Sequence, residues 1–298
     1  MQAPGTTAPL FIGGLCRSGT SLLRCMIGQH SAFFSGLETH WFGMDWQAGP
    51  QGGVAERNET LEERLDLLQQ LFEVQPDDMA RIIKESRSAT HFLNRFMSYC
   101  TSRAGKRRWV EKTPGNVFHL VTIHAAWEHA GFIHVVRDPR DVFASFKGSK
   151  TYHTPELFAP HWCRFLGASH KAREHYKSDD KWFMDVRYEQ LVFQPVSVMK
   201  GVIDFVGEGW EEAAGRFDGN AHDVEVVRKV LGWEGPTTSR LGTPLLTDRV
   251  GIWKKQTTPK EINRIREMVA DQGLLSYFDA MIEQTEADLL AIGQRADA

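Results

Sequence analysis

The chain has 298 residues, of which 42% are hydrophobic and 24% are charged, a composition that allows one large globular α/β domain or two small ones. Its net charge of −3 gives no sign of the basic face of a nucleic-acid-binding protein. No run of about 18 apolar residues predicts a membrane span, and the start MQAPGTTAP lacks the parts of a secretory signal. We therefore expect a cytoplasmic protein whose cysteines, scattered without metal or disulfide spacing, are reduced.

Four short apolar runs predict buried strands, LFIGG at 10–14, RWVEKT at 108–113, GFIHVVRD at 131–138 and KWFMDVRYEQL at 181–191. The segments between them have helical patterns, at 60–72, 77–100, 116–130 and 139–148. The first of these begins with Thr60 followed by Glu63, the pattern of a capping box. Strands that alternate with helices predict an α/β fold with a central parallel sheet covered on both faces.

The order of these segments predicts a single domain over residues 1–298. We expect the helical stretch at about 57–104 to be an insertion between the first two strands, and two helices within about 259–293 to close the chain. The segments 147–162 and 232–244 are expected to be loops.

The first strand runs into GLCRSGTS at 14–21, a glycine-rich turn followed by a helix start. Backbone N–H groups and the helix dipole at such a turn form an anion site. The pattern is that of a phosphate-binding P-loop, except that Thr20 stands where nucleotide hydrolases have lysine. Arg17 can supply the missing positive charge, with a planar fork suited to phosphate or sulfate oxygens. The loop therefore predicts an anion site but argues against ATP hydrolysis.

A second candidate phosphate site follows the third predicted strand. Arg137 comes at the carboxyl end of that strand, and Ser145 lies eight residues later on the next helix. Ligands of open α/β sheets bind at this edge, so both side chains could face the same crevice as the loop at 14–21. A salt bridge from Arg137 to Asp138 or Asp141 is the alternative.

With these two motifs the chain resembles the sulfotransferases that use 3′-phosphoadenylyl sulfate (PAPS). Their phosphosulfate loop reads P-R-S-G-T-[ST]-L, which is matched here by Arg17, Ser18, Gly19, Thr20 and Ser21, with Cys16 in place of the proline. Their 3′-phosphate site is an arginine followed by a serine at the spacing found here. The resemblance implies a P-loop-type three-layer α/β/α fold with a helical insertion.

Within that family the motifs are most similar to those of the tyrosylprotein sulfotransferases and their bacterial relatives. SGLETHWF places Glu38 at the position of their catalytic base, and VEKTPGN places Lys112 at that of their catalytic lysine. His40 stands where those relatives have arginine, which leaves their peptide preference in doubt. Three further matches imply contacts with the nucleotide, at Tyr188, Ser239 and Lys254.

The resemblance implies in-line transfer of the PAPS sulfuryl group to an acceptor hydroxyl on a small molecule or peptide. Glu38 would be the general base, while Arg17 and Lys112 would stabilise the leaving phosphate of the product 3′-phosphoadenosine 5′-phosphate (PAP), without a required metal. We expect burial to raise the pKa of Glu38 and so strengthen it as a base. His40 is the alternative base because imidazole titrates near neutrality.

Two other functions compete with this interpretation. A P-loop phosphotransferase would use ATP, with magnesium held by Asp185 at the end of the apolar run WFMDV. A binding protein would keep the nucleotide site without chemistry and would need neither Glu38 nor Lys112. The acceptor remains open among tyrosine, sugar, lipid and aromatic metabolite, and so does the oligomeric state.

Overall fold

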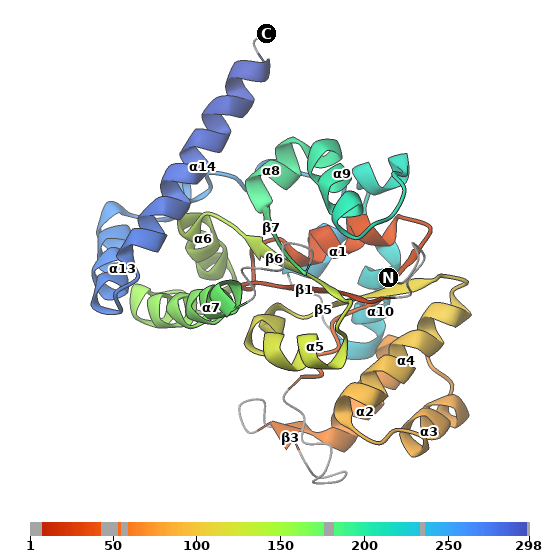
Figure 1. Cartoon of the computed structure of the whole chain (residues 1–298). Helices are drawn as coiled ribbons and strands as arrows, with labels where there is room; N and C mark the ends of the chain where they lie inside the picture. The colour runs from red at the N-terminus through yellow and green to blue at the C-terminus, as the bar shows by residue number, and fades with distance from the viewer. Residues whose placement is uncertain (1–7, 43–52, 55–58, 176–181, 233–235, 297–298) are drawn as a thin grey trace.

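The computed structural model describes residues 8–42, 53–54, 59–175, 182–232 and 236–296. Parts of three predicted segments, at 57–58, 181 and 233–235, lie outside the described residues. Five parallel strands form the central sheet in the order β2–β5–β1–β6–β7 (Figure 1). They are β1 Leu10–Gly13, β2 Phe33–Ser35, β5 Arg108–Lys112, β6 Gly131–Val136 and β7 Phe183–Arg187. The predicted α/β class with a central parallel sheet is confirmed.

Helices cover both faces of this sheet (Figure 1). The sheet therefore separates the hydrophobic core into two layers. On one face, Leu10 and Ile12 of β1 pack beneath α1 (Thr20–Gly28) and α9 (Pro195–Phe205). On the other face, Phe11 lies in the core formed with α4, α5 and α7 (Ala89–Arg103, Leu120–Ala126 and Pro155–His175). Because strand side chains alternate between faces, a four-residue apolar run is enough to serve both cores.

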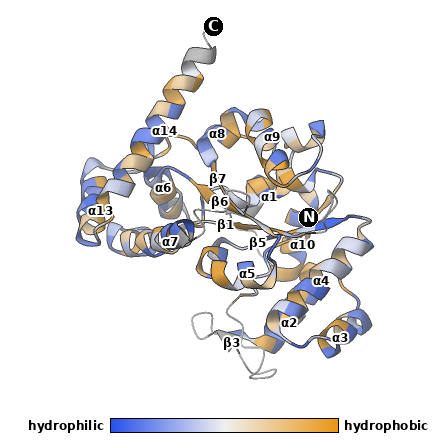
Figure 2. Ribbon diagram, viewed as in Figure 1, coloured by the Kyte–Doolittle hydropathy of each residue, from blue (hydrophilic) through white to orange (hydrophobic). Residues whose placement is uncertain are grey.

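The remaining elements surround this framework. Two short strands, β3 Gly53–Val54 and β4 Glu59–Thr60, pair antiparallel outside the main sheet. The other helices are α2 Leu61–Leu71, α3 Pro76–Lys84, α6 Pro139–Ser149, α8 Tyr188–Phe193, α10 Ala221–Leu231, α11 Pro236–Leu241, α12 Trp253–Gln256, α13 Pro259–Asp271 and α14 Leu275–Ala296, with 3₁₀ turns at Pro114–Phe118 and Glu212–Gly215. Figure 2 shows apolar and polar residues alternating along α4 and α13, as expected for helices with one buried face.

Several helix boundaries follow the sequence signals closely. The predicted capping box is confirmed, because Thr60 accepts from the Glu63 amide at 3.2 Å while the Glu63 carboxylate accepts from the Thr60 amide at 2.7 Å. The closing helices α13 and α14 occupy the segments expected for them. The helix predicted over 77–100 is instead two helices, because Ser88 accepts from the His91 amide at 3.1 Å and starts α4 anew.

Three other sequence expectations were wrong in detail. The strand predicted over 181–191 ends at Arg187, the last residue paired with β6, and Tyr188 begins α8. The loop predicted over 147–162 gives way to α7 at Pro155, where proline suits the first turn of a helix. The loop predicted over 232–244 contains the short helix α11.

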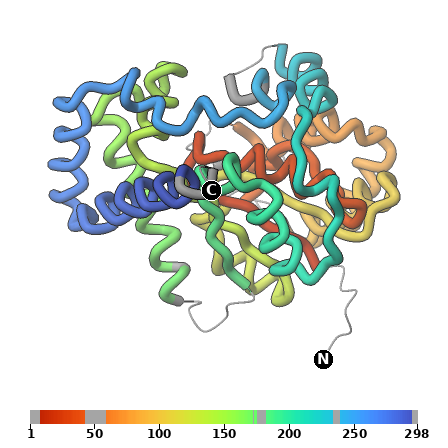
Figure 3. Tube along the Cα trace, turned by 90° about the horizontal axis from the view of Figure 1, so that it is seen from above, coloured from red at the N-terminus to blue at the C-terminus, as the bar shows by residue number. Residues whose placement is uncertain are grey.

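The carboxyl-terminal part of the chain returns over the phosphate-binding loop. Seen from above, the segment between α11 and α13 crosses the molecule over the amino-terminal region (Figure 3). Asp141 of α6 fixes this segment, since its carboxylate accepts from the amides of Gly251 and Trp253 at 2.7 and 3.0 Å. The crossing closes one side of the site described next.

Candidate functional site

The turn after β1 has the backbone of a phosphate-binding loop. Gly14 and Gly19 adopt φ of 143° and 98°, and a Cβ would lie 2.4 Å from the Val135 carbonyl oxygen at the first and 2.4 Å from the Tyr188 ring at the second. Glycine is therefore required at both positions. Arg17 also lies in the left-handed region, at φ 72°. Such strain in a non-glycine residue is typical of binding loops.

Helix α1 begins at the end of this turn, with its amino-terminal end at the candidate anion site. Thr20 and Ser21 occupy its first turn, where N–H groups have no intrahelical partner and the helix dipole favours an anion. Both residues line a pocket together with Arg17 and Gly19. Ser18 is 2% exposed and does not line this pocket; it faces a smaller cavity beside His134.

Arg137 joins the loop to the carboxyl-terminal segment. Its two terminal nitrogens donate to the carbonyl oxygens of Arg17 at 2.8 Å and Arg249 at 2.6 Å, and its guanidinium lies 4.4 Å from the Tyr188 ring centre. The Asp141 carboxylate is 4.0 Å away. The structure therefore brings the second predicted phosphate site directly to the first.

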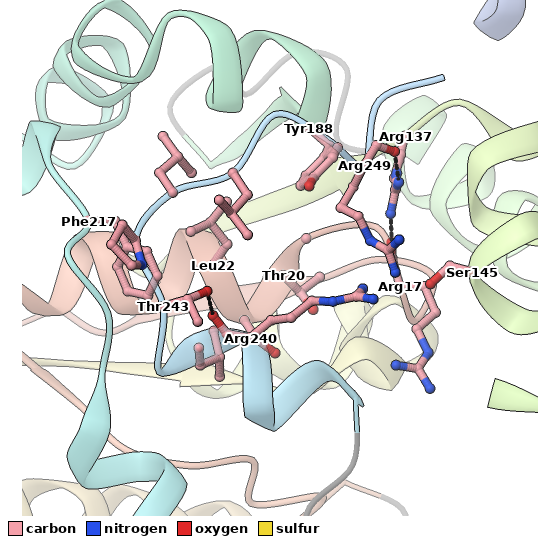
Figure 4. A pocket seen from close by; sticks show the side chains of 16 residues that line it. Arg17, Thr20, Leu22, Arg137, Ser145, Tyr188, Phe217, Arg240, Thr243 and Arg249 are labelled. Atoms are coloured by element: carbon pink, nitrogen blue, oxygen red, sulfur yellow. Dashed lines mark hydrogen bonds between the residues drawn. The ribbon is translucent and has the colours of Figure 1, made fainter. Parts of the chain in front are cut away.

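These elements enclose one pocket of about 120 Å³, which we call the donor pocket. It is lined by Arg17, Gly19, Thr20, Ser21, Leu22, Arg137, Ser145, Tyr188, Phe217, Arg240, Leu241, Thr243, Pro244, Leu245, Leu246 and Arg249. Figure 4 shows Arg17, Arg137 and Arg249 gathered at one end, with Phe217 and Leu22 at the other. The pocket thus combines a strongly cationic end with an apolar wall.

Two of its four arginines were missed by sequence reasoning, which named Ser239 and Lys254 in this region. Ser239 and Lys254 do not line the donor pocket, whereas Arg240 and Arg249, their near neighbours, do. Lys254 lies 6.0 Å from the Trp253 ring centre. A nucleotide contact by Ser239 or Lys254 stays a prediction. The sequence signal for Arg240 was its place within the predicted loop 232–244, and no sequence prediction covered Arg249.

Beside the donor pocket, Lys112 at the end of β5 contacts Glu38. Its ammonium donates to the Ser21 hydroxyl at 2.8 Å and forms an ion pair with Oε1 of Glu38. Nε2 of His40 lies 2.8 Å from the other carboxylate oxygen. Lys112 is thus not paired with Glu111, its neighbour in the strand. We call the group Glu38, Thr39, His40, Glu111 and Lys112 the base corner.

Lys112 changes the acid–base character expected of Glu38. Burial acts to raise the pKa of this carboxyl, but the charge of Lys112 and the hydrogen bond from His40 outweigh it and hold the pKa well below its usual range. The expectation that burial would raise the pKa of Glu38 is therefore wrong. A carboxylate paired in this way is ionised at neutral pH and is a weak base until the lysine charge is engaged elsewhere.

Asp185, the proposed magnesium ligand of an ATP-dependent alternative, lies outside the donor pocket. Its carboxylate contacts Nδ1 of His134 at 3.0 Å and forms an ion pair with Arg173. Within the described ranges, no cluster of three His, Cys, Asp or Glu side chains is arranged to hold a metal ion, and no described helix has the length and apolarity that a bilayer crossing requires.

Comparison with known proteins gives one family and several structures with a similar fold. Residues 9–212 match a family described as the sulfotransferase family. A sulfotransferase domain from the Synechococcus PCC 7002 olefin synthase is 20% identical, with 91% of this chain and 98% of that chain covered and a TM-score of 0.59. A sulfotransferase domain from the curacin biosynthetic pathway is 18% identical, with 90% and 98% covered and a TM-score of 0.59. No curated protein sequence matches significantly.

Proposed function

The chain belongs to the sulfotransferase family, an enzyme family of sulfuryl transfer, and on that premise we propose that PAPS is its donor and that the donor pocket binds it. PAPS has an anionic group at each end of its ribose and a flat purine base. The observation that carries the proposal is the direct contact of Arg137 with the Arg17 carbonyl, because it puts both candidate phosphate sites in one pocket.

The lining of the donor pocket fits such a molecule. The amides and hydroxyls of Thr20 and Ser21 with Arg17 would hold the phosphosulfate, and Arg137, Ser145 and Arg249 would hold the 3′-phosphate. Nε of Arg137 is buried without a hydrogen-bond partner. Leu22, Phe217 and Leu245 supply an apolar wall of the kind that packs against a purine.

In the proposed reaction the donor supplies a sulfur–oxygen bond whose cleavage leaves negative charge on a phosphate. Lys112 and Arg17 are positioned to stabilise that charge, a contribution of roughly 3–4 kcal/mol for a preorganised donor. Glu38 takes the proton of the acceptor hydroxyl, which contributes roughly 10²–10⁴-fold to the rate. Because Lys112 contacts both Ser21 and Glu38, a phosphate beside Ser21 would compete for its charge and leave Glu38 more basic.

The proposal requires no metal, because cationic side chains carry the charge, and it places the reaction in the cytoplasm. All four cysteines, Cys16, Cys25, Cys100 and Cys163, are free thiols, which suits a reducing compartment. Burial raises the pKa of Cys16, beside the loop, to about 11, so its thiol is protonated and uncharged.

Calorimetric titration of the protein with PAP, with AMP and with ATP plus magnesium tests the donor assignment. We expect PAP to bind most tightly, AMP more weakly because it lacks the 3′-phosphate, and ATP with magnesium weakest. The variant Lys255→Met, which changes an exposed cation outside the pocket lining, is the control and should bind PAP normally. Tighter binding of ATP with magnesium than of PAP would contradict the proposal.

Two variants separate the candidate bases. Glu38→Gln should lose roughly 10²–10⁴-fold in turnover, while His40→Asn should lose less because it only hydrogen-bonds the base. Turnover at saturating PAPS is the measurement. A near-normal rate for Glu38→Gln with a large loss for His40→Asn would transfer the role of base to His40.

A further inference from the structure

Glu111 is a fully buried carboxylate that the proposed chemistry leaves without a role. It is 0% exposed and lies one residue before Lys112 on β5. Oε1 accepts from the Thr39 amide at 3.3 Å and from the hydroxyls of Thr39 and Thr113 at 2.7 Å each. Oε2 accepts from the Asn116 amide nitrogen at 2.6 Å. A buried carboxylate held by four neutral donors has a specific structural task, since its desolvation is costly.

The alternation of side chains along β5 explains what that task is. Successive strand residues point to opposite faces of a sheet. Glu111 and Lys112 therefore approach the segment that follows β2 from opposite faces. Lys112 contacts the carboxylate of Glu38, and Glu111 contacts the backbone and hydroxyl of the next residue, Thr39. Two consecutive strand residues therefore hold two consecutive residues of the segment that carries the base.

The segment around Glu38 depends on such contacts because it follows β2 without regular structure of its own. Upstream, the buried guanidinium of Arg24 donates to the carbonyl oxygens of Ser35 at 3.2 Å and Gly36 at 2.8 Å. Downstream, His40 adopts φ 48°, a left-handed conformation that a non-glycine residue keeps only when its surroundings impose it.

Thr113 contacts the backbone of this strained residue. Its hydroxyl accepts from the His40 amide at 3.1 Å and donates to Glu111 at 2.7 Å. Asn116 in turn donates to the Ile12 carbonyl oxygen at 3.0 Å, which ties the group to the central strand β1. His40, two positions after Glu38, is thus connected to the central strand of the sheet.

We propose that Glu111 is a positioning residue, which with the hydroxyls of Thr39 and Thr113 forms a clamp that fixes Glu38 beside Lys112 and the donor pocket. The inference rests on the proposed function, in which Glu38 is the base. The carboxylate is suited to the clamp because it only accepts hydrogen bonds and every neighbour donates one. Replacing it with glutamine would direct an NH₂ group at one or more of those donors.

Hydroxyl-deletion variants test the clamp with little change in shape. We expect Thr39→Val and Thr113→Val each to lower kcat by about 10- to 100-fold, since small displacements of a reacting group have effects of this size. Thr39→Ser and Thr113→Ser keep the hydroxyl and should recover most of the rate. KM for PAPS should stay within about twofold in all four variants, because none of these residues lines the donor pocket.

A matched pair of buried carboxylates separates positioning from general stability. Glu111→Gln should lower both the melting temperature and kcat. Asp288→Asn removes a carboxylate of α14 that is 9% exposed and binds Arg187 at 2.7 Å, so it should lower the melting temperature and leave kcat unchanged. If Asp288→Asn lowered kcat as much as Glu111→Gln, the loss would reflect stability and the clamp would be rejected.

Failure of the clamp and failure of the proposed function give different results. If both valine variants keep the wild-type kcat while Glu38→Gln is impaired, the clamp is wrong and the base assignment stands. If Glu38→Gln itself keeps the wild-type kcat, the base assignment is wrong and the clamp has no base to position.

Discussion

The donor pocket and the base corner lie side by side but differ in how their charges are balanced. The donor pocket gathers four arginines beside an apolar wall, with carbonyl oxygens as the acceptors of Arg137. In the base corner, Lys112 and Glu38 already neutralise one another, His40 contacts the same carboxylate, and Glu111 is satisfied by neutral donors. The first region is arranged to receive an anion, and the second to keep a reactive group in place. Changes in the first, other than at Arg17, which also faces the leaving phosphate in the proposed reaction, should alter affinity, and changes in the second should alter turnover.

The variant Lys112→Met should have a large effect, because Lys112 contacts both regions. Loss of its charge removes a donor to the developing phosphate, which predicts a fall in kcat of about 10²–10³-fold. It also removes the main group that lowers the pKa of Glu38, so this pKa should rise toward the value that burial favours. Single-turnover rates measured across pH would show both effects. An unchanged rate would show that Lys112 takes no part in the chemical step.

Removing Arg240 or Arg249 from the donor pocket should affect binding alone. Arg249→Met and Arg240→Met are each expected to weaken PAP binding about tenfold, the size of one lost charge-assisted hydrogen bond, with kcat at saturating PAPS retained. Lys255→Met is again the control for charge outside the lining. Calorimetry gives the dissociation constants. If kcat fell while affinity stayed constant, the division between the two regions would be wrong.

The pH dependence of His40→Asn tests the base corner more finely. As the proposed base, Glu38 must be ionised, and although burial acts to raise its folded-state pKa, Lys112 and the His40 hydrogen bond depress it. Activity is therefore retained as pH falls until this low pKa is reached. Weakening the hydrogen bond should raise the pKa of Glu38 and move the acid limb of kcat/KM to higher pH. An acid limb displaced to lower pH would contradict the assigned contact.

The smallest effect is expected at His161, on α7 and outside both regions. Burial and the charge of Arg164 lower the pKa of its imidazole to about 4. Between this value and the ordinary one the unfolded chain binds the extra proton, so stability rises with pH through that window. His161→Phe should flatten the dependence of the melting temperature on pH there and leave turnover unchanged. A slope identical to that of the wild type would show that this imidazole does not titrate as described.

The same division explains how far the sequence could predict the molecule. The loop at 14–21 and the Arg137/Ser145 pair were identified because each is a local motif that begins at a strand end, and the sheet brings strand ends together. Strand β2 was missed because three residues give no periodic signal. Arg240 and Arg249 were missed because only the crossing of the carboxyl-terminal segment, fixed by Asp141, places them in the pocket.

The base corner shows a different limit. Its two main residues, Glu38 and Lys112, were identified from a family resemblance, but their ion pair and its effect on pKa depend on contacts 74 positions apart. The link from Glu111 to Thr39, 72 positions apart, leaves no sequence pattern either. Residue types could be predicted from motifs, whereas the state of the carboxylate required the packing of β5 against the segment after β2.

Transfer of label from radiosulfur-labelled PAPS to an acceptor in cell extract tests the central claim most directly, when wild type and Glu38→Gln are compared with a metal chelator present. The account predicts acceptor-bound label with the wild type, and its near absence with Glu38→Gln although that variant still binds PAP. Label that leaves PAPS only as inorganic sulfate, or equal acceptor labelling by both proteins, would contradict it.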